Sequence, residues 1–377
     1  MTTQARSKPT RLAMLEAHTS TLEKCVYCPK LCRASCPVSN VEPTESLTPW
    51  GKMSASYFLG RGDMALEADT ASVAWGCTGC GACKERCDHR NDVATTLRDT
   101  RAEAFARGAA PETARRVAAD HRTRGMAIAA RAAEVFASEP APQGSAAVVV
   151  GCGYHLFDLR ASTGARLDAL AVRAVSRLLG DSPPRVIDVC CGAPLLDAGD
   201  REGFVRAAET FAAAAAAADP LVAVDPGCAR TIATDYPRVG VTLRAPTLLV
   251  DLAAKSVDKL STAPLGEAPR YHDPCQLARG LGRVDEPRRI LAKVAGAPPR
   301  EFQRNGTMTE CSGGGGLLPV TMPEASREIA DRRLAEHRAK GDGKLVTACA
   351  SSLRRFRASG EQADDLIEWI ARGLGLP

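Results

Sequence analysis

The chain has 377 residues, of which 45% are hydrophobic and 4% aromatic, and its formal net charge is +5. This length predicts two or three domains with substantial cores. The charge is too small and too scattered to indicate nucleic-acid binding, although it favours docking to an acidic partner or an anionic membrane surface. No stretch approaches the roughly 20 apolar residues of a spanning helix, and residues 1–11 lack the apolar core of a signal peptide. We therefore expect a cytoplasmic protein that reaches a membrane only peripherally, through a partner.

Eight of the fifteen cysteines form two groups near the N-terminus. In each group three thiols are closely spaced and a fourth follows. This pattern is typical of two-cluster ferredoxins, in which the fourth thiol of each run binds the iron of the other cluster. The spacing predicts one [4Fe–4S] cluster on Cys25, Cys28, Cys32 and Cys87, and a second on Cys77, Cys80, Cys83 and Cys36.

Two alternatives exist for these thiols. Zinc also binds four thiolates, but its sites usually use two separated C-x2-C pairs. A disulfide framework is typical of short secreted chains and is rare in reducing cytosol. The first group also has one extra residue between Cys28 and Cys32, and Asp88 stands where Pro is common after the second group.

Helices are expected on both sides of the cysteine groups. Residues 11–24 and 91–107 have helical patterns, and Trp50, Met53, Tyr57 and Phe58 recur at helical spacing. The latter are either ordinary core residues or a cover over the cysteine loops. The pattern predicts an α-helical two-cluster ferredoxin domain over residues 1–110.

A connecting segment is expected over residues 111–144. Its first part, 111–137, predicts one long basic helix, and residues 140–145 are a Pro- and Gly-containing linker. The basic face is either solvated or docks a partner. Its arginines are Arg115, Arg116, Arg122, Arg124 and Arg131.

Strands and helices alternate from residue 145 onward, which predicts parallel α/β sheets. Strands are expected at 146–150, 185–189, 221–224, 270–272 and 344–347, and helices at 163–179 and 202–218. We expect one repeat over 145–262 and a second, degenerate repeat over 263–377.

The other seven cysteines follow the expected strands. Cys152 precedes Cys191 by 39 residues, and Cys275 precedes Cys311 by 36, which indicates an internal duplication with a period near 120. Ligands of open α/β sheets bind at the carboxyl ends of the strands. The seven residues are Cys152, Cys190, Cys191, Cys228, Cys275, Cys311 and Cys349.

These motifs, with the segment His272-Asp273-Pro274-Cys275, resemble the paired cysteine-rich CCG domains of heterodisulfide reductase subunits. The iron–sulfur subunits of glycolate oxidase and of anaerobic glycerol-3-phosphate dehydrogenase share the order of a ferredoxin domain before two CCG domains. The resemblance extends from about residue 22 to about residue 357. It implies an iron–sulfur oxidoreductase subunit, without defining its substrate.

The resemblance also implies five cysteines in each CCG domain, and neither repeat here has them. Asp225 replaces one in the first repeat; in the second, Glu310 and Ser352 replace cysteines and Ser312 replaces the Gly. Four thiols with a carboxylate are enough for one further cluster in the first repeat. Three thiols with Glu310 make a weaker site, and the alternative is that Cys275, Cys311 and Cys349 are buried small hydrophobes.

Three other motifs carry weaker signals. Gly151-x-Gly153 lacks the third Gly of a dinucleotide loop. Residues 313–316 are four glycines that either let backbones approach closely or form a flexible turn. His272 beside Asp273 is either an oriented imidazole or a structural motif. No catalytic side chain is predicted.

The sequence therefore predicts an iron–sulfur electron-transfer subunit. Its partner would be a flavoprotein dehydrogenase that oxidises a small substrate, a 2-hydroxy acid or glycerol phosphate by resemblance, with a quinone or another carrier as acceptor. The alternative is a heterodisulfide reductase-like thiol–disulfide oxidoreductase with a cluster in the CCG region. A redox or iron sensor ranks third.

Overall fold

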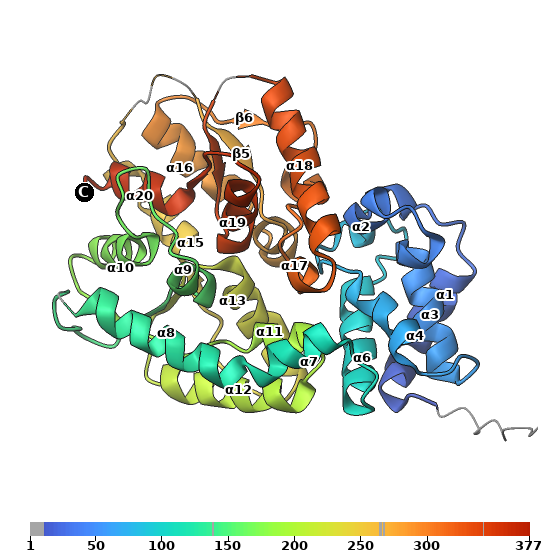
Figure 1. Ribbon diagram of the computed structural model, residues 1–377. Coiled ribbons are helices and arrows are strands. Elements are labelled where there is room, and N and C mark those ends of the chain that lie inside the picture. Colours follow the sequence, from blue (N-terminus) through green and yellow to red (C-terminus); the bar gives the residue numbers. More distant parts are fainter. Residues whose placement is uncertain (1–10, 138, 264–265, 267, 342) are drawn as a thin grey trace, which may run out of the picture. The chain divides into compact units, whose positions relative to one another are not determined.

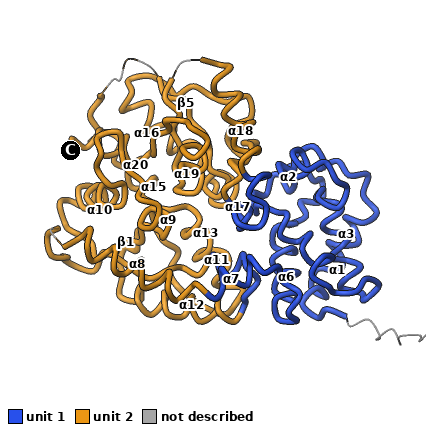
Figure 2. Tube along the Cα trace, viewed as in Figure 1, with its two compact units in different colours: residues 1–119, 194–201, 315–326 blue, residues 120–193, 202–314, 327–377 orange. Residues whose placement is uncertain are grey.

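The structure is a computed structural model that describes residues 11–137, 139–263, 266, 268–341 and 343–377. The expectation that residues 1–11 are not a signal peptide falls on residues outside the described ranges, except for Arg11. Contacts divide the chain into two units, shown in Figure 2. Unit 1 contains residues 1–119, 194–201 and 315–326, and unit 2 contains the rest. The boundaries expected at residues 110, 144 and 262 stay predictions. No helix among the described residues is long and apolar enough to cross a membrane.

The regular secondary structure of unit 1 is all helical over its described residues, as predicted for a ferredoxin of this class. Its core includes Leu15, Met53, Trp75 and Leu97, all nearly inaccessible to solvent. The principal helices are α1 (Thr19–Val26), α2 (Pro37–Val41), α3 (Pro49–Arg61), α4 (Ala68–Ser72), α5 (Ala82–Glu85), α6 (Val93–Ala106), α7 (Glu112–Ala119) and α17 (Leu318–Thr321).

Helix α3 is defined by local signals at both ends. The Thr48 side chain accepts a hydrogen bond from the Gly51 amide at 3.0 Å, and Pro49 occupies the first turn. Both features favour a helix start. The helix ends at Arg61 and is capped by Gly62, whose left-handed φ of 77° suits glycine. Within the predicted stripe, Met53 is buried, whereas Phe58 is 37% exposed.

The prediction of one helix over 111–137 is wrong. The structure has two helices, α7 and α8 (His121–Phe136), with Asp120 between them. The Asp side chain competes for nearby backbone N–H groups, which makes it one of the weaker residues inside a helix. The first helix belongs to unit 1 and the second to unit 2.

Unit 2 contains two four-stranded parallel sheets with the same connectivity, which confirms the α/β prediction. The orders are β2-β1-β3-β4 and β6-β5-β7-β8. In the first sheet, Ala147 lies opposite Arg185 on one side and Leu221 on the other. The strands are β1 (Ala147–Val149), β2 (Arg185–Val186), β3 (Leu221–Ala223), β4 (Thr247–Leu248), β5 (Arg270–His272), β6 (Arg300–Glu301), β7 (Leu345–Thr347) and β8 (Asp364–Asp365).

The structure supports the internal duplication and corrects several element boundaries. Strands β1 and β5 begin 123 residues apart, and β3 and β7 begin 124 apart, close to the expected period. Strands β4, β6 and β8 were not predicted, because two residues are too few to show a periodicity. Strand β2 is shorter than predicted. The helix expected from residue 163 begins only at Leu167, and the one expected over 202–218 is α12 (Arg201–Ala215).

Four helices pack between the two repeats. Helix α10 contacts α20, α15 contacts α16, and these pairs also contact each other (Figure 1). In each repeat one of these helices comes after the first strand and the other follows the last. Their apolar faces therefore join the repeats into one unit. The helices are α10 (Leu167–Leu178), α15 (Leu249–Lys255), α16 (Asp285–Ala295) and α20 (Leu366–Gly373).

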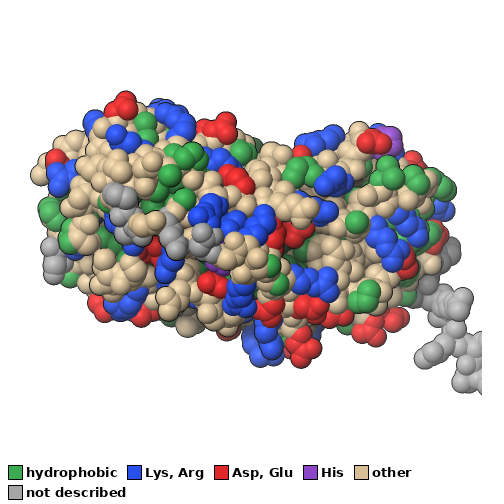
Figure 3. Space-filling model, turned by 90° about the horizontal axis from the view of Figure 1, so that it is seen from above, with side chains coloured by type: hydrophobic (Ala, Val, Ile, Leu, Met, Phe, Trp, Pro, Cys, Tyr) green, Lys and Arg blue, Asp and Glu red, His purple; other side chains and the backbone are tan. Residues whose placement is uncertain are grey.

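Charged side chains are mixed over the face drawn in Figure 3. Lys and Arg side chains lie beside Asp and Glu side chains there, without one continuous region of a single sign. This mixture agrees with the mild net charge of +5.

Candidate functional site

The first three cysteines lie near Cys87 in unit 1. Burial raises the pKa of Cys25, and the neighbouring thiols of Cys87 and Cys28 raise it further. Burial likewise raises the pKa of Cys32 to about 11, with contributions from Cys25, Cys28 and Cys87. The fourth thiol of the second sequence group is therefore a neighbour of the first three thiols.

The second set has the reciprocal arrangement. Burial raises the pKa of Cys83 well above its usual value, followed by the effects of Cys80, Cys77 and Cys36. Cys36, the fourth thiol of the first group, thus lies with the second group. Cys32 also acts on Cys83, so the two sets are adjacent. This is the exchange of fourth thiols expected for a two-cluster ferredoxin, and the ligand assignment stays a prediction.

A pocket lies over the first set. Trp50 lines it, and the indole N–H donates a 3.1 Å hydrogen bond to the carbonyl of Val26. The ammonium of Lys30 lies 3.9 Å from the centroid of the Trp50 ring. Trp50 of the α3 stripe therefore lies beside the cysteine loop, and Met53 and Tyr57 belong to the core against which Cys25, Cys77 and Cys83 pack. The lining residues are Lys24, Cys25, Cys28, Lys30, Cys32, Pro49, Trp50, Cys83, Cys87, His89, Asn91 and Val93.

Hydrogen-bond donors point at the sulfur atoms of both sets. The amide of Asn91 donates to Cys25 Sγ at 3.1 Å, and the backbone amide of Gly79 donates to Cys77 Sγ at 3.4 Å. The ammonium of Lys52, whose side chain is 1% exposed, donates to Cys36 Sγ at 3.4 Å. A buried ammonium requires an anionic neighbour. The residues present therefore fit thiolate-bound, negatively charged clusters.

A glycine pair and one arginine hold the loop of the second set. A Cβ on Gly316 would lie 2.2 Å from the Cys77 carbonyl oxygen, and one on Gly315 would lie 2.5 Å from that of Thr78. The guanidinium of Arg101 donates to the Cys77 carbonyl at 2.8 Å. Of the two interpretations of the glycine run, close backbone approach is confirmed at Gly315 and Gly316.

The four thiols of the first repeat also lie together. Cys191 and Cys228 have their sulfur atoms 3.4 Å apart. The hydrogen bond with Cys152 lowers the pKa of Cys190, but Cys191 and burial raise it to about 12. For Cys228, the hydrogen bond with Cys191 lowers the pKa, whereas burial and Asp225 raise it to about 11. The four thiols are thus neighbours, and the Asp225 carboxylate acts on Cys228.

Arg124 is the one residue of the predicted basic face that reaches these thiols. Its Nη2 donates to Cys152 Sγ at 3.3 Å. By contrast, Arg115 pairs with Glu112 on the surface, and Arg131 pairs with Glu134 and with Asp158. The solvated-face interpretation therefore fits Arg115, but not Arg124 or Arg131.

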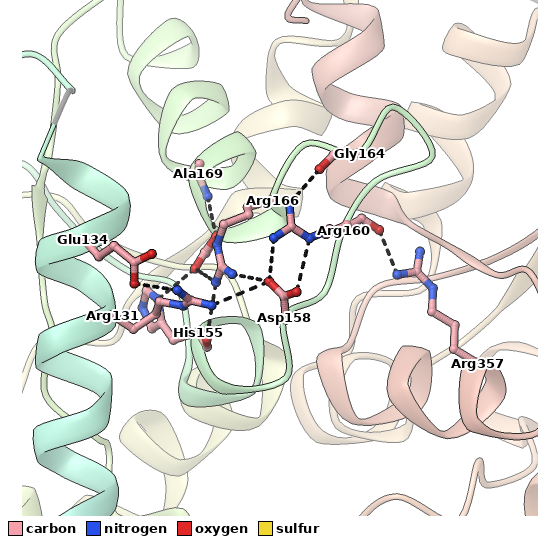
Figure 4. Close-up of polar contacts among 10 residues, drawn as sticks. Arg131, Glu134, His155, Asp158, Arg160, Gly164, Arg166, Ala169 and Arg357 are labelled. Carbon is pink, nitrogen blue, oxygen red and sulfur yellow. Dashed lines mark hydrogen bonds and ion pairs between the residues drawn. The ribbon is translucent and has the colours of Figure 1, made fainter.

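An ion-pair network fixes the short helix that carries Cys152, α9 (Cys152–Leu156). Nδ1 of His155 lies 3.2 Å from Oδ2 of Asp168, and Arg166 donates to the same oxygen at 2.7 Å and to the His155 carbonyl at 3.3 Å. Figure 4 shows Arg160 and Arg166 directed at Asp158 in the loop that follows α9. The network therefore fixes the backbone just beyond Cys152.

The second repeat has a different environment. Gly313 donates its amide to Cys311 Sγ at 3.3 Å, and burial raises the pKa of Cys349 to about 12. Glu310 pairs at 3.2 Å with Arg304, and the two side chains are about half exposed. The replaced positions Ser312 and Ser352 bond each other at 2.8 Å. The Ser pair satisfies two buried hydroxyls where the resemblance implies a Gly and a Cys.

His272 is enclosed rather than poised for proton transfer. Its Nδ1 accepts a 3.3 Å hydrogen bond from Arg333 Nε, and its ring packs in T-shaped pairs with Phe302 and Phe356. Burial holds its pKa well below the usual range. Asp273 beside it binds Arg288 at 2.7 Å. These contacts favour the structural interpretation.

Sequence reasoning missed two residues that contact the proposed sites. Lys52 lies in an apolar helix with no motif around it, and Arg124 stood among similar arginines. Within the described ranges, no three His, Cys, Asp or Glu side chains are arranged to hold a single metal ion.

Comparison with known proteins places these sites in two families. Residues 21–91 match the 4Fe-4S dicluster domain, and residues 127–233 and 270–354 match the cysteine-rich domain named CCG. The second match includes all seven cysteines of unit 2.

Similar proteins are components of reductases. The B component of the fumarate reductase (CoM/CoB) of Methanothermobacter marburgensis is 28% identical over 88% of this chain and 66% of its own length. The D component of the dihydromethanophenazine:CoB–CoM heterodisulfide reductase of Methanosarcina mazei is 26% identical over 60% of this chain and 58% of its own length. The Hdr-like menaquinol oxidoreductase iron-sulfur subunit 2 of Archaeoglobus fulgidus is 34% identical over 23% of this chain and 17% of its own length.

The chain thus spans less than two thirds of the length of these relatives. The match to the cysteine-rich domain covers more than half of this chain, and the dicluster match precedes it. Both matches are independent of the length of the relatives. The chain belongs to the cysteine-rich (CCG) domain family, and it is an iron–sulfur protein with two [4Fe–4S] clusters in an N-terminal dicluster domain.

Proposed function

We propose that the protein is the electron-transfer subunit of a multi-subunit oxidoreductase. The observation that carries this proposal is the pair of adjacent four-thiol sets, each completed by the fourth cysteine of the other sequence group. Iron–sulfur clusters supply one-electron chemistry when bound. Adjacent clusters suit a relay that accepts electrons singly and passes them on.

The proposed donor is a flavoprotein subunit that oxidises a 2-hydroxy acid or glycerol phosphate, and the acceptor is a quinone or another carrier. Three relatives named as subunits of reductases or oxidoreductases support a partner of this general kind. The Gly151-x-Gly153 segment is better explained by packing than by a dinucleotide: a Cβ on Gly151 would lie 2.7 Å from Asp225 Cβ, and one on Gly153 2.8 Å from Ala350 Cβ.

A second candidate is thiol–disulfide reduction in the first repeat. The 3.4 Å pair of Cys191 and Cys228 sulfurs, and the hydrogen bond that Arg124 donates to Cys152, favour it. The same residues, with Asp225, would hold a further iron–sulfur cluster. The missing fifth cysteine argues against a heterodisulfide reductase of the usual kind.

Anaerobic purification with iron and acid-labile sulfide counts tests the first proposal. We expect about eight irons per chain from the two ferredoxin clusters, and more if the first repeat is loaded. About one zinc and no sulfide would overturn it. Co-purification from the native source, followed by reduction of the clusters with the flavoprotein and its substrate, tests the partner.

The variant Cys190→Ser separates the two candidates. If the protein only relays electrons through its ferredoxin clusters, electron transfer to the physiological acceptor continues at the wild-type rate and no disulfide-reductase activity exists to lose. If the first repeat reduces disulfides, that turnover disappears in the variant while cluster reduction persists.

A further inference from the structure

The two four-thiol sets of unit 1 differ in the charge of the side chain that donates to their sulfur. In the set with Cys25, the donor is the neutral amide of Asn91 at 3.1 Å. In the set with Cys36, the donor is the ammonium of Lys52 at 3.4 Å. Each predicted set has four cysteines, and in the second set the backbone amide of Gly79 also donates to Cys77. The side-chain donors of the two sets therefore differ by one elementary charge.

The charge on Lys52 is enclosed by the protein. Its side chain is 1% exposed, and α3 holds its backbone through a 3.0 Å bond from the Lys52 amide to the Thr48 carbonyl. In the part of the chain that the structure describes, no Asp or Glu oxygen lies within 4.0 Å of its ammonium. Its electrostatic effect also reaches Cys77 of the same set. The charge thus acts on two sulfurs and is not cancelled by a carboxylate.

The other cations near the two sets differ from Lys52 in their contacts. Arg101, near Cys77, shares the Asp197 carboxylate with Arg98, at 3.8 Å and 3.0 Å, and donates to the backbone carbonyls of Ala74 and Cys77. Lys30, beside the first set, pairs with Glu45 at 3.4 Å, and Lys24 is exposed. Exposed charges are screened by water and salt, whereas buried ones are screened much less. Lys52 is a buried cation that donates directly to a sulfur of its set, so water and salt screen its charge little.

Reduction of an iron–sulfur cluster adds one negative charge, so a fixed positive charge nearby favours the reduced form. Net charge and hydrogen bonds to the sulfurs are among the factors that set the reduction potential. A hydrogen bond from a charged donor is roughly twice as strong as one from a neutral donor. Lys52 contributes both effects, and Asn91 contributes only the weaker hydrogen bond.

We propose that Lys52 sets the order of reduction, so that the cluster on Cys36, Cys77, Cys80 and Cys83 accepts the electron before the cluster on Cys25, Cys28, Cys32 and Cys87. This inference rests on the proposed electron-transfer function. The electron comes from the donor, which is oxidised as the cluster is reduced, and no bond is made or broken. Lys52 is a positioning and charge-setting residue, not a catalytic one.

The test is a redox titration of the full chain with dithionite under anaerobic conditions, followed by electron paramagnetic resonance. In Lys52→Met we expect the cluster that is reduced first in the wild type to lose at least tenfold in its reduction equilibrium constant, a fall of 59 mV for one electron. The midpoint potential of the other cluster is unchanged. Lys52→Arg keeps the charge and retains the wild-type order. Asn91→Leu shifts only the other cluster, and by less.

Iron and sulfide counts accompany each titration. If the Lys52→Met protein lacks a cluster, the titration is done with Lys52→Gln instead, because Gln keeps a hydrogen-bond donor without the charge. Unchanged midpoints in a fully loaded Met or Gln variant overturn this inference alone, as does an equal shift of both clusters. A wild-type protein without iron overturns the proposed function itself.

Discussion

The hydroxyl of Tyr154 donates a 2.9 Å hydrogen bond to the carboxylate of Asp365, and both residues are buried. Tyr154 belongs to α9 of the first repeat, and Asp365 ends β8 of the second. Two positions 211 residues apart thus meet at the junction of the repeats. Asp365 also caps α20 by accepting the amide of Ile367 at 2.9 Å.

This pair predicts a pH-dependent stability. Burial raises the pKa of Asp365 to about 7, although its bonds to Ile367 and Tyr154 lower it in part. The folded state therefore binds the proton of the Asp365 carboxyl more tightly than the unfolded state does. Protonated Asp365 contributes its full stabilisation below about pH 4, and this contribution is lost as the pH rises through 7. We expect Asp365→Asn, which cannot ionise, to gain about 2–3 kcal/mol relative to the wild type between pH 5 and pH 8.

Chemical denaturation of both proteins at the two pH values measures this difference. Tyr154→Phe serves as the matched variant: without its hydroxyl, the pKa of Asp365 rises further, and the loss of stability moves to higher pH. A constant difference between the wild type and Asp365→Asn across the range would contradict the prediction.

The exchange of fourth thiols predicts which cysteine variants behave alike. Cys36→Ala and Cys80→Ala should lose the same cluster, although the residues come from different sequence groups, and Cys87→Ala should lose the other. Each variant should fall from about eight irons to about four, with local unfolding, because cluster binding and folding are coupled. The paramagnetic resonance signal that remains identifies the surviving cluster. If Cys36→Ala loses the same signal as Cys87→Ala, the ligand assignment is wrong.

Arg101 is predicted to stabilise unit 1. Its side chain is 2% exposed and donates to the carbonyls of Ala74 at 3.0 Å, Cys77 at 2.8 Å and Asp197 at 3.0 Å. Arg101→Met leaves these buried acceptors without their donor, which should cost about 3 kcal/mol. Arg107→Met is the control, since Arg107 is 38% exposed in an i,i+4 pair and should cost less than about 0.5 kcal/mol. Thermal unfolding of the loaded proteins measures both, and equal effects would refute the role of Arg101.

Gly316 is predicted to tolerate no side chain. Its φ is +62°, and a Cβ would lie 2.2 Å from a backbone oxygen of the second cysteine loop. Gly316→Ala should therefore destabilise unit 1 and slow cluster loading. Gly125→Ala is the control: Gly125 lies in α8, and a Cβ added there would meet nothing within 4 Å, so Ala should raise stability by about 0.5–1 kcal/mol. A loaded Gly316→Ala protein as stable as the wild type would refute the close approach.

Sequence alone determined the features whose signal is local. Cysteine spacing predicted the two clusters, and alternating strands and helices predicted the parallel sheets, because each pattern lies within a few tens of residues. The duplication was visible because the cysteine intervals recur. The sequence could not predict strands of two residues, nor the break at Asp120 inside an otherwise helical pattern.

Tertiary structure decided what depends on contacts between distant segments. It showed that Lys52 donates a hydrogen bond to Cys36, that Arg124 donates one to Cys152, and that Gly316 contacts the loop of Cys77. Lysines and arginines are mostly exposed in proteins, so the sequence gives no reason to expect a particular one to be buried. Only the packing shows which of them lies beside a sulfur. The chemistry of the thiols could therefore be predicted from the sequence, whereas the charged side chains that contact them were determined by the fold.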